Sequence, residues 1–317
     1  MSDFTKDLPG IFKERLSEDV ASSSSITTGK HNTSYFVDTK SEQYVIRIAP
    51  PDGTALLFYE RNMMAQEPEL HRIIREKTDA PVAEVVEFDS SRSIIDRDYI
   101  IMRRLEGNPL SQTQVTGTQY NGIMHEIGEY LAQVHSITAG SYGYIGAHRP
   151  MEPQKTWWSA FRVMWGKLLD DIVGVGVYSD DEREMLVRLL DENRSCFDDS
   201  QRMVEPSLLH MDIWSQNILV DGNLKVTGIV DWDRALWGDP EIEYAVLDYC
   251  GISQPGFWEG YGRTRDDSTE ARIRHVFYYL YEHQKYIVIR IGRRNNPDAA
   301  RQYKEETFQI LRKRFSF

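Results

Sequence analysis

The stretch from Leu208 to Leu247 constrains the fold more than any other part of this 317-residue chain. Two short apolar runs, 218–220 and 226–230, flank the sequence Asp-Gly-Asn, which is typical of a β-hairpin turn. We expect this hairpin to return Asp231 close to Asn217. Carboxylate and amide oxygens crowded at one place repel each other unless a cation neutralises them. Oxygen ligands of this kind suit Mg²⁺, which commonly bridges protein oxygens to phosphates.

The same stretch resembles the catalytic core of the aminoglycoside phosphotransferase family, which are small-molecule kinases with a protein-kinase-like fold. The family pattern is His-x-Asp-x-x-x-x-Asn, strand-turn-strand, Ile-(Val or Ile)-Asp-(Trp or Phe)-(Asp or Glu) and then Gly-Asp-Pro. All of it is present here in order and spacing, as His210, Asp212, Asn217, Ile229-Val230-Asp231-Trp232-Asp233 and Gly238-Asp239-Pro240. Under the alternative, purely structural interpretation, these polar residues would serve only as caps and turn residues.

The resemblance implies an α+β, bilobal protein-kinase-like fold. A small antiparallel β-sheet N-lobe with one main helix would be followed by a larger, mostly helical C-lobe. We expect the nucleotide-binding lobe to cover residues 1–104 and the catalytic and substrate-binding lobe to cover residues 105–317. A chain of this length suits two lobes that share one cleft.

The family roles carry over residue by residue. Asp212 would accept or orient the proton of the substrate hydroxyl, and His210 would organise the site by bonding the backbone near Asp231. Asn217 and Asp231 would hold the Mg²⁺ ions that bridge the nucleotide phosphates. Asp233 would either contact the metal indirectly or be structural.

A strand-turn-strand pattern at 26–37 contains Gly29 and Asn32. By itself it is an ordinary hairpin, but beside the downstream core it resembles the family's nucleotide-covering loop. Small residues in such a loop let the backbone present its N–H groups to phosphates. We therefore expect Gly29 and Asn32 to contact the nucleotide.

Arg47 lies within the apolar strand 44–48. In related kinases a cation at this position contacts the α- and β-phosphates and pairs with a carboxylate of a helix. The partner would come from a helix predicted around 59–75. Glu67 is the first candidate and Glu60 the second.

The segment 99–110 ends in Gly-Asn-Pro, where the sheet lobe should pass into the helical lobe. It resembles the family's hinge, so backbone groups of Met102, Arg103 and Arg104 would hydrogen-bond adenine. Beyond it the apolar residues step by three or four, which predicts helices. The clearest are 157–169, 181–190 and a stripe over 273–291, followed by a last helix that begins at Pro297.

Composition limits the function classes. A formal net charge of −12 argues against nonspecific nucleic-acid binding, which needs a basic face. The two cysteines indicate no disulfide framework, and no apolar run approaches the ~20 residues of a membrane span. The N-terminus MSDFTKDLPG has no signal-peptide pattern. We expect a cytoplasmic protein that binds neither membrane nor nucleic acid.

The resemblance implies a kinase that uses ATP or GTP, with Mg²⁺, to phosphorylate a hydroxyl of a small molecule. Acidic and aromatic residues interleave over 239–270, which favours a cationic, aminoglycoside-like acceptor. A solvated acidic surface explains the same pattern. Other acceptors remain open, namely choline, homoserine, a sugar or a macrolide. A silent nucleotide-binding protein, or a metal-dependent hydrolase with His210 and Asp212 as ligands, are the further alternatives.

Overall fold

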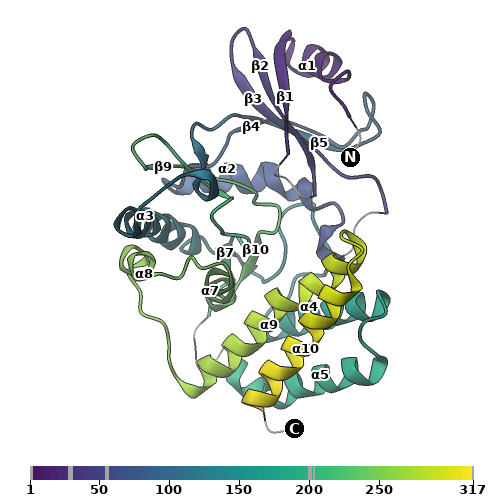
Figure 1. Cartoon of the computed structure of the whole chain (residues 1–317), viewed down its shortest axis with the longest axis vertical. Coiled ribbons are helices and arrows are strands. Elements are labelled where there is room, and N and C mark those ends of the chain that lie inside the picture. The colour runs from purple at the N-terminus through teal and green to yellow at the C-terminus, as the bar shows by residue number, and fades with distance from the viewer. Residues whose placement is uncertain (1–2, 28–30, 54–56, 199–201, 203, 316–317) are drawn as a thin grey trace.

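The structure is a computed structural model, and it describes residues 3–27, 31–53, 57–198, 202 and 204–315. A sheet-rich part formed by the N-terminal residues lies above a helix-rich part in Figure 1. This arrangement confirms the α+β, two-part architecture expected from the sequence. The lobe boundary at 104/105 remains a prediction, although strand β5 ends at Arg103 and the helices of the lower part follow it.

One antiparallel sheet forms the upper part, with strand order β1-β2-β3-β5-β4. Its strands are β1 (Val20–Ile26), β2 (Thr33–Thr39), β3 (Gln43–Ile48), β4 (Val85–Asp89) and β5 (Tyr99–Arg103). Alternation along β3 sends Tyr44, Ile46 and Ile48 into a core that also contains apolar side chains of helix α1 (Leu8–Leu16). The alternate residues of β3, including Arg47, therefore point to the opposite face.

The prediction of one helix around residues 59–75 is wrong in its bounds. Two short 3-10 helices, η1 (Phe58–Glu60) and η2 (Met63–Gln66), precede an α-helix, α2 (Glu67–Lys77). Asn62 lies between the two 3-10 helices with a φ of 59°, in the left-handed region that interrupts a right-handed helix. Pro68 then occupies the first turn of α2, where its missing N–H costs nothing. Glu60 and Glu67 thus belong to different elements.

The lower part consists mainly of helices around two apolar cores. Its helices are α3 (Gly117–His135), α4 (Trp157–Gly174), α5 (Asp180–Glu192), α7 (Pro240–Tyr249), α8 (Pro255–Tyr261), α9 (Thr269–Gly292) and α10 (Pro297–Arg314), with two short 3-10 helices, η3 (Leu110–Gln112) and η4 (Arg194–Phe197). The predicted helices over 157–169, 181–190 and 273–291 are confirmed as α4, α5 and α9. Asn296 caps α10, since its side chain accepts from the Ala299 N–H at 3.0 Å.

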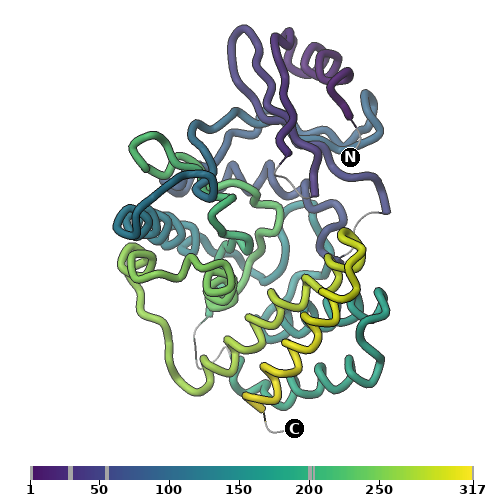
Figure 2. Tube along the Cα trace, viewed as in Figure 1, coloured from purple at the N-terminus to yellow at the C-terminus, as the bar shows by residue number. Residues whose placement is uncertain are grey.

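Two small sheets lie between the halves. One contains β6 (Asn108–Pro109), β8 (Ile218–Val220) and β9 (Val226–Ile229), and the other pairs β7 (Ser207–Leu209) with β10 (Leu236–Gly238). The tube in Figure 2 shows the turn between α9 and α10 approaching the sheet-rich part from below. Among the described residues, no helix is both long and apolar enough to cross a bilayer.

Candidate active site

The β8–β9 hairpin positions the first two predicted site residues. Ile218 pairs with Ile229 in the hairpin register, and the Val230 N–H donates to the Asn217 carbonyl at 2.9 Å. Asn217 and Asp231 therefore leave the hairpin at the same end. Asp231 has a φ of 67°, a conformation that a non-glycine residue adopts only where the surroundings impose it. The local fold that the sequence predicted is present.

Asp212 and His210 belong to the same hydrogen-bond network. The Asn217 Nδ2 atom donates to the carbonyl oxygen of Asp212 at 2.9 Å and to its Oδ2 at 3.1 Å. The His210 Nδ1 atom accepts from the Asp212 N–H at 3.1 Å, so Nε2 carries the proton that reaches the Val230 carbonyl at 3.0 Å. The imidazole thus joins the loop of Asp212 to the residue that precedes Asp231.

Glu243, on α7, fixes the backbone of this loop from below. Its carboxylate accepts from the N–H of His210 at 3.0 Å and of Met211 at 2.7 Å, and from the His135 Nε2 at 2.8 Å. Met211 has a φ of 67°. Burial alone would raise the pKa of Glu243, but His135 and the other donors outweigh it and hold the pKa below its ordinary value. An ionised, fully buried carboxylate therefore holds the strained turn before Asp212.

Arg47 connects the sheet to this loop. Its guanidinium lies 2.8 Å from Glu67 Oε2, 2.7 Å from Asp231 Oδ1 and 2.9 Å from Asp233 Oδ2. The ion pair predicted between Arg47 and Glu67 is present. The second candidate, Glu60, forms an ion pair with Arg293 instead.

Burial and mutual repulsion perturb these carboxylates. Desolvation by the surrounding protein raises the pKa of Asp231 to about 6, even though part of its side chain reaches solvent; the neighbouring Asp233 adds to the rise, and Arg47 opposes it. Burial also raises the pKa of Glu67 to about 8 against the charge of Arg47. One guanidinium is thus insufficient for three carboxylates, and a second cation would relieve the excess negative charge.

The oxygens at this place suit a hard divalent cation. The Asp231 side chain is 39% exposed, whereas that of Asp233 is 7% exposed, so Asp231 is the one that solvent reaches. Both side-chain hydrogen bonds of Asn217 use Nδ2, which leaves its amide oxygen as a possible ligand. Within the described ranges, no group of three or more His, Cys, Asp or Glu side chains forms a ready metal site. A cation held by Asn217 and Asp231 would therefore need further ligands from phosphate or water, as Mg²⁺ typically does.

Asp212 also faces two cations that the sequence analysis did not identify. Arg234 Nη1 lies 2.8 Å from Asp212 Oδ1, and Lys285 Nζ lies 3.8 Å from the same oxygen. Burial would raise the pKa of Asp212, but Arg234 and Lys285 outweigh it and lower the pKa. The sequence contains one indication of these cations. The charged residues Glu282 and Lys285 lie one turn apart within the apolar stripe of α9, where two charges are unexpected.

Four of the five predicted nucleotide-contacting residues outside the Arg47–Glu67 pair lie within the described part of the chain. Gly29 falls outside the described residues, and Asn32 is buried, with 8% exposure. The Arg103 N–H donates to the Glu84 carbonyl and the Arg104 N–H to the Gln43 carbonyl, both at 2.9 Å. These two N–H groups are already engaged, so an adenine ring would have to use carbonyl groups here, or the next N–H group along the chain.

Buried Met102 precedes these residues on β5. The guanidinium of Arg104 lies 4.1 Å from the centre of the Phe36 ring. Adenine binding by Met102, Arg103 and Arg104 therefore stays a prediction.

Several acids of the segment 239–270 are engaged within the protein. Glu241 pairs with Arg274 at 2.7 Å, and Asp248 pairs with Arg265 at 2.8 Å. Glu243 accepts the hydrogen bonds of the loop described above. The acid–aromatic interleaving that suggested a cationic acceptor thus reflects internal ion pairs to a large extent.

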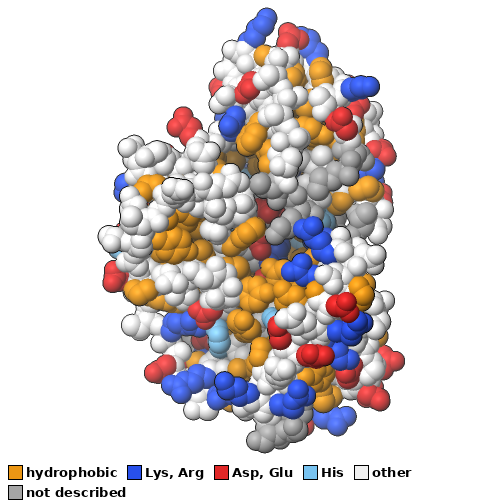
Figure 3. Space-filling view, viewed as in Figure 1, with side chains coloured by type: hydrophobic (Ala, Val, Ile, Leu, Met, Phe, Trp, Pro, Cys, Tyr) orange, Lys and Arg blue, Asp and Glu red, His pale blue; other side chains and the backbone are white. Residues whose placement is uncertain are grey.

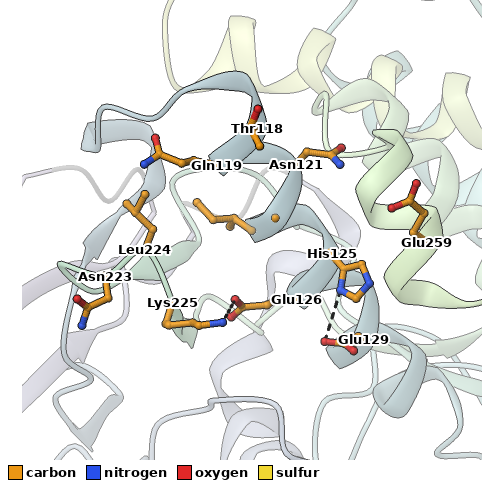
Figure 4. Close-up of a pocket in the computed structure, with 12 residues that line it drawn as sticks. Thr118, Gln119, Asn121, His125, Glu126, Glu129, Asn223, Leu224, Lys225 and Glu259 are labelled. Atoms are coloured by element: carbon orange, nitrogen blue, oxygen red, sulfur yellow. Dashed lines mark hydrogen bonds and ion pairs between the residues drawn. The ribbon is translucent and has the colours of Figure 1, made fainter.

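Figure 3 shows a hollow below the sheet-rich part, with acidic and basic side chains inside it and further Lys and Arg side chains at its edge. A separate hollow of about 610 Å³ lies between α3, α8 and the β8–β9 turn (Figure 4). Its side chains pair with one another, Lys225 with Glu126 and His125 with Glu129. It shares no residue with the cluster around Asp212, which remains the candidate active site.

Comparison with known proteins agrees with this geometry. The chain is 26% identical to a "Probable ketoamine kinase" of Vibrio parahaemolyticus, over 79% of each chain. It is also 26% identical to the Hygromycin-B 4-O-kinase of Escherichia coli, over 53% of this chain and 47% of that one.

Two solved structures have the same fold. A "Putative fructosamine-3-kinase" from Haemophilus somnus matches with a TM-score of 0.70 and 16% identity, covering 98% of this chain and 97% of that one. A thermostable mutant of an aminoglycoside phosphotransferase, in a ternary complex with AMP-PNP and hygromycin B, matches with a TM-score of 0.67 and 20% identity, covering 98% of this chain and 100% of that one. The expected kinase-like fold is confirmed.

The model of the Phosphotransferase enzyme family matches residues 24–276, which include Arg47, Glu67, the β8–β9 hairpin and Glu243. The matched range covers well over half of the chain. This chain belongs to the phosphotransferase enzyme family, whose resemblance the residues from His210 to Pro240 first indicated.

Proposed function

We propose that this protein is a small-molecule kinase that transfers the γ-phosphate of ATP, or of GTP, to a hydroxyl of its acceptor. The observation that carries the proposal is the single network of Asp212, Asn217 and Asp231, tied through Arg47 to Glu67. Phosphoryl transfer requires an aligned acceptor oxygen and neutralised phosphate charge, and these side chains are of the kinds that supply both.

Each side chain has a role in this proposal. Asp212 receives the acceptor hydroxyl and orients its proton, and Asn217 and His210 hold Asp212 in place. Arg47, which is held in place by its ion pair with Glu67, binds the nucleotide phosphates. Asn217 and Asp231 would hold Mg²⁺, which when bound would neutralise phosphate charge.

The base in this site is a weak one, because the pKa of Asp212 is lowered. A weak base suits phosphoryl transfer, since a loose transition state demands little proton removal before the new bond forms. Positioning of the hydroxyl is therefore the main contribution of Asp212.

For the acceptor, we propose a polyhydroxylated compound of the sugar type. The sequence pattern suggested an aminoglycoside-like amino sugar. A ketoamine, which also combines sugar hydroxyls with an amine, is favoured by the "Probable ketoamine kinase" relative that this chain matches over 79% of its length. A cytoplasmic location fits the two free cysteines, Cys196 and Cys250.

Turnover of nucleotide with and without Mg²⁺ and acceptor tests the proposal. A kinase should form ADP in an acceptor-dependent manner, and Asp212→Ala should lower the rate by about a hundredfold or more. Asp267→Ala is the matched control, since that carboxylate is 95% exposed. A silent protein would bind nucleotide without turnover that depends on Asp212, and a hydrolase would act without any nucleotide. Either result would refute the proposal.

A further inference from the structure

We infer that His31 is a further phosphate-binding residue of the nucleotide site, and that Arg293 positions it from the C-terminal end of α9. The inference rests on the proposed kinase function, since it concerns the nucleotide of that reaction. Neither residue carries a role predicted from the sequence. The two are 262 residues apart in the chain, so their spacing could not indicate that they meet.

The first support is the register of the upper sheet, which brings His31 to the end of the sheet where Arg47 lies. Thr33 pairs with Ile48, and Ser34 pairs with Arg47, at one end of the β2–β3 ladder. Consecutive Cα atoms are about 3.8 Å apart, so the Cα atom of His31 lies within about 8 Å of that of Thr33. His31 is therefore close to the cation that we propose to bind the phosphates.

The second support is the contact that holds the ring of His31. Arg293 directly follows the last residue of α9, and its Nη2 atom donates to His31 Nδ1 at 3.0 Å. The same guanidinium pairs with Glu60, whose side chain is only 4% exposed. Glu60 also accepts from the Leu57 N–H at 3.2 Å. The buried carboxylate thus balances the charge of Arg293 and fixes its place, and Arg293 in turn fixes the imidazole ring.

The third support is the proton that this contact leaves on the ring. A guanidinium can only donate, so His31 Nδ1 is the acceptor and Nε2 carries the hydrogen of a neutral ring. Burial lowers the pKa of His31, and the charges of Arg293 and Arg47 lower it further against those of Glu60 and Asp231. Nε2 donates to none of the described residues, so its hydrogen is available to a ligand.

A neutral N–H donor at this place suits a polyphosphate. It adds a hydrogen bond to an anionic oxygen, and such bonds are stronger than those between neutral groups. It also adds no further positive charge near the guanidinium groups of Arg47 and Arg293, which like-charge repulsion would oppose. The ring of His31 therefore extends the phosphate site of Arg47 to the residues that precede β2.

Helix α9 contacts both sides of the proposed site in this arrangement. Lys285 of this helix lies 3.8 Å from Asp212, and Arg293 is a little over two turns further on, about 12 Å along the helix axis. The end of this helix approaches the sheet-rich part (Figure 2). One rigid element thus sets the place of the proposed base and, through Arg293, that of a donor to the phosphates.

Calorimetric binding of Mg²⁺·AMP-PNP and of adenosine to the full-length protein tests the inference, and it requires no knowledge of the acceptor. His31→Leu removes both ring nitrogens and should weaken AMP-PNP binding by about tenfold or more. Adenosine has no phosphates and should bind this variant as it binds wild type. His31→Gln keeps an N–H donor and should restore part of the affinity for AMP-PNP.

Arg293→Met should weaken AMP-PNP binding by about fivefold. Its matched control is Arg294→Met, which removes the same charge from the exposed neighbouring position and should leave binding unchanged. Because Arg293 acts through His31, the double variant His31→Leu/Arg293→Met should bind AMP-PNP no more weakly than His31→Leu. If the unpaired Glu60 prevents Arg293→Met from folding, Glu60→Gln/Arg293→Met takes its place and is compared with Glu60→Gln.

Four results would overturn the inference and leave the kinase function standing. These are unchanged AMP-PNP binding by His31→Leu, an equal loss for adenosine, effects of the His31 and Arg293 substitutions that add, and an equal loss in Arg294→Met. If wild type binds no Mg²⁺·nucleotide, the proposed function itself fails and the inference fails with it. The two failures are thus distinguishable.

Discussion

Replacing Glu243 by Gln removes the charge that holds the loop before Asp212. The carboxylate accepts from three donors, His210 N–H, Met211 N–H and His135 Nε2, at 2.7 to 3.0 Å, and its side chain is fully buried. Gln retains one acceptor oxygen, but its NH₂ group must face at least one of these donors. The donor with the shortest bond to the carboxylate, and the one we expect to lose its acceptor, is the N–H of Met211, a residue with a left-handed φ.

The magnitude follows from these contacts. A lost hydrogen bond to a charged acceptor costs about 1.5–3 kcal/mol, and a buried unsatisfied donor adds about 1–3 kcal/mol. We therefore expect Glu243→Gln to lower the free energy of unfolding by about 2.5–6 kcal/mol, against a total of about 5–15 kcal/mol for a typical domain. Displacement of Asp212 by the relaxed loop should lower kcat by about ten- to a hundredfold, with little change in nucleotide KM.

Urea denaturation and steady-state kinetics measure the two effects, with Glu259→Gln on the exposed face of α8 as the control. The pH dependence adds a signature. Because the folded pKa of Glu243 is lowered, its contribution is present above the unfolded pKa of about 4.3 and is lost as pH falls through the folded pKa. The stability gap between wild type and Glu243→Gln should therefore narrow in acid. A variant as stable and active as the control would refute the reasoning.

Three further predictions concern neighbouring contacts. Arg47→Met leaves three carboxylates without their common cation, so we expect a loss of about 3–5 kcal/mol in urea denaturation and weaker Mg²⁺·ATP binding, with Arg47→Lys intermediate. Since Asp231 has a pKa of about 6 and must be ionised to bind a cation, Mg²⁺·ATP affinity by calorimetry should rise as pH increases through 6, and Asp231→Asn should remove this step. Gly260→Ala would place a Cβ 2.0 Å from the backbone carbonyl oxygen of His125, where α8 packs against α3, so thermal unfolding should show a loss of about 1–3 kcal/mol, and an unchanged Tm would contradict this packing.

Local patterns allowed much of the fold and the centre of the site to be predicted. The hairpin that joins Asn217 to Asp231 follows from a turn between two short strands, because its contacts are between neighbours in sequence. The Arg47–Glu67 ion pair could be predicted from the family resemblance, since strand β3 and helix α2, which carry the two residues, both lie within the sheet-rich part. The helices were predicted from apolar periodicity, which is present because one face of each helix packs against the apolar cores of the lower part.

Long-range pairing of charges could not be predicted. Arg234 meets Glu282 across 48 residues, and Glu241 meets Arg274 across 33 residues. Nothing in the spacing of such residues indicates which cation will neutralise which acid. The acidic segment therefore suggested a pocket for a cation, whereas the structure uses several of its acids internally. The break at Asn62 depends on a single left-handed residue, which apolar periodicity does not reveal.

The triple contact of Arg47 ties the two halves of the molecule together. Glu67 and Arg47 itself belong to the upper half, while Asp231 and Asp233 belong to the loop after β9 in the lower half. Any tilt of the sheet against the helices must stretch these bonds, so separation of the halves and loss of charge balance are one event. A triphosphate that drew the guanidinium away from both Asp231 and Asp233 would at the same moment free the two halves to move relative to each other and release Asp231 for a metal ion.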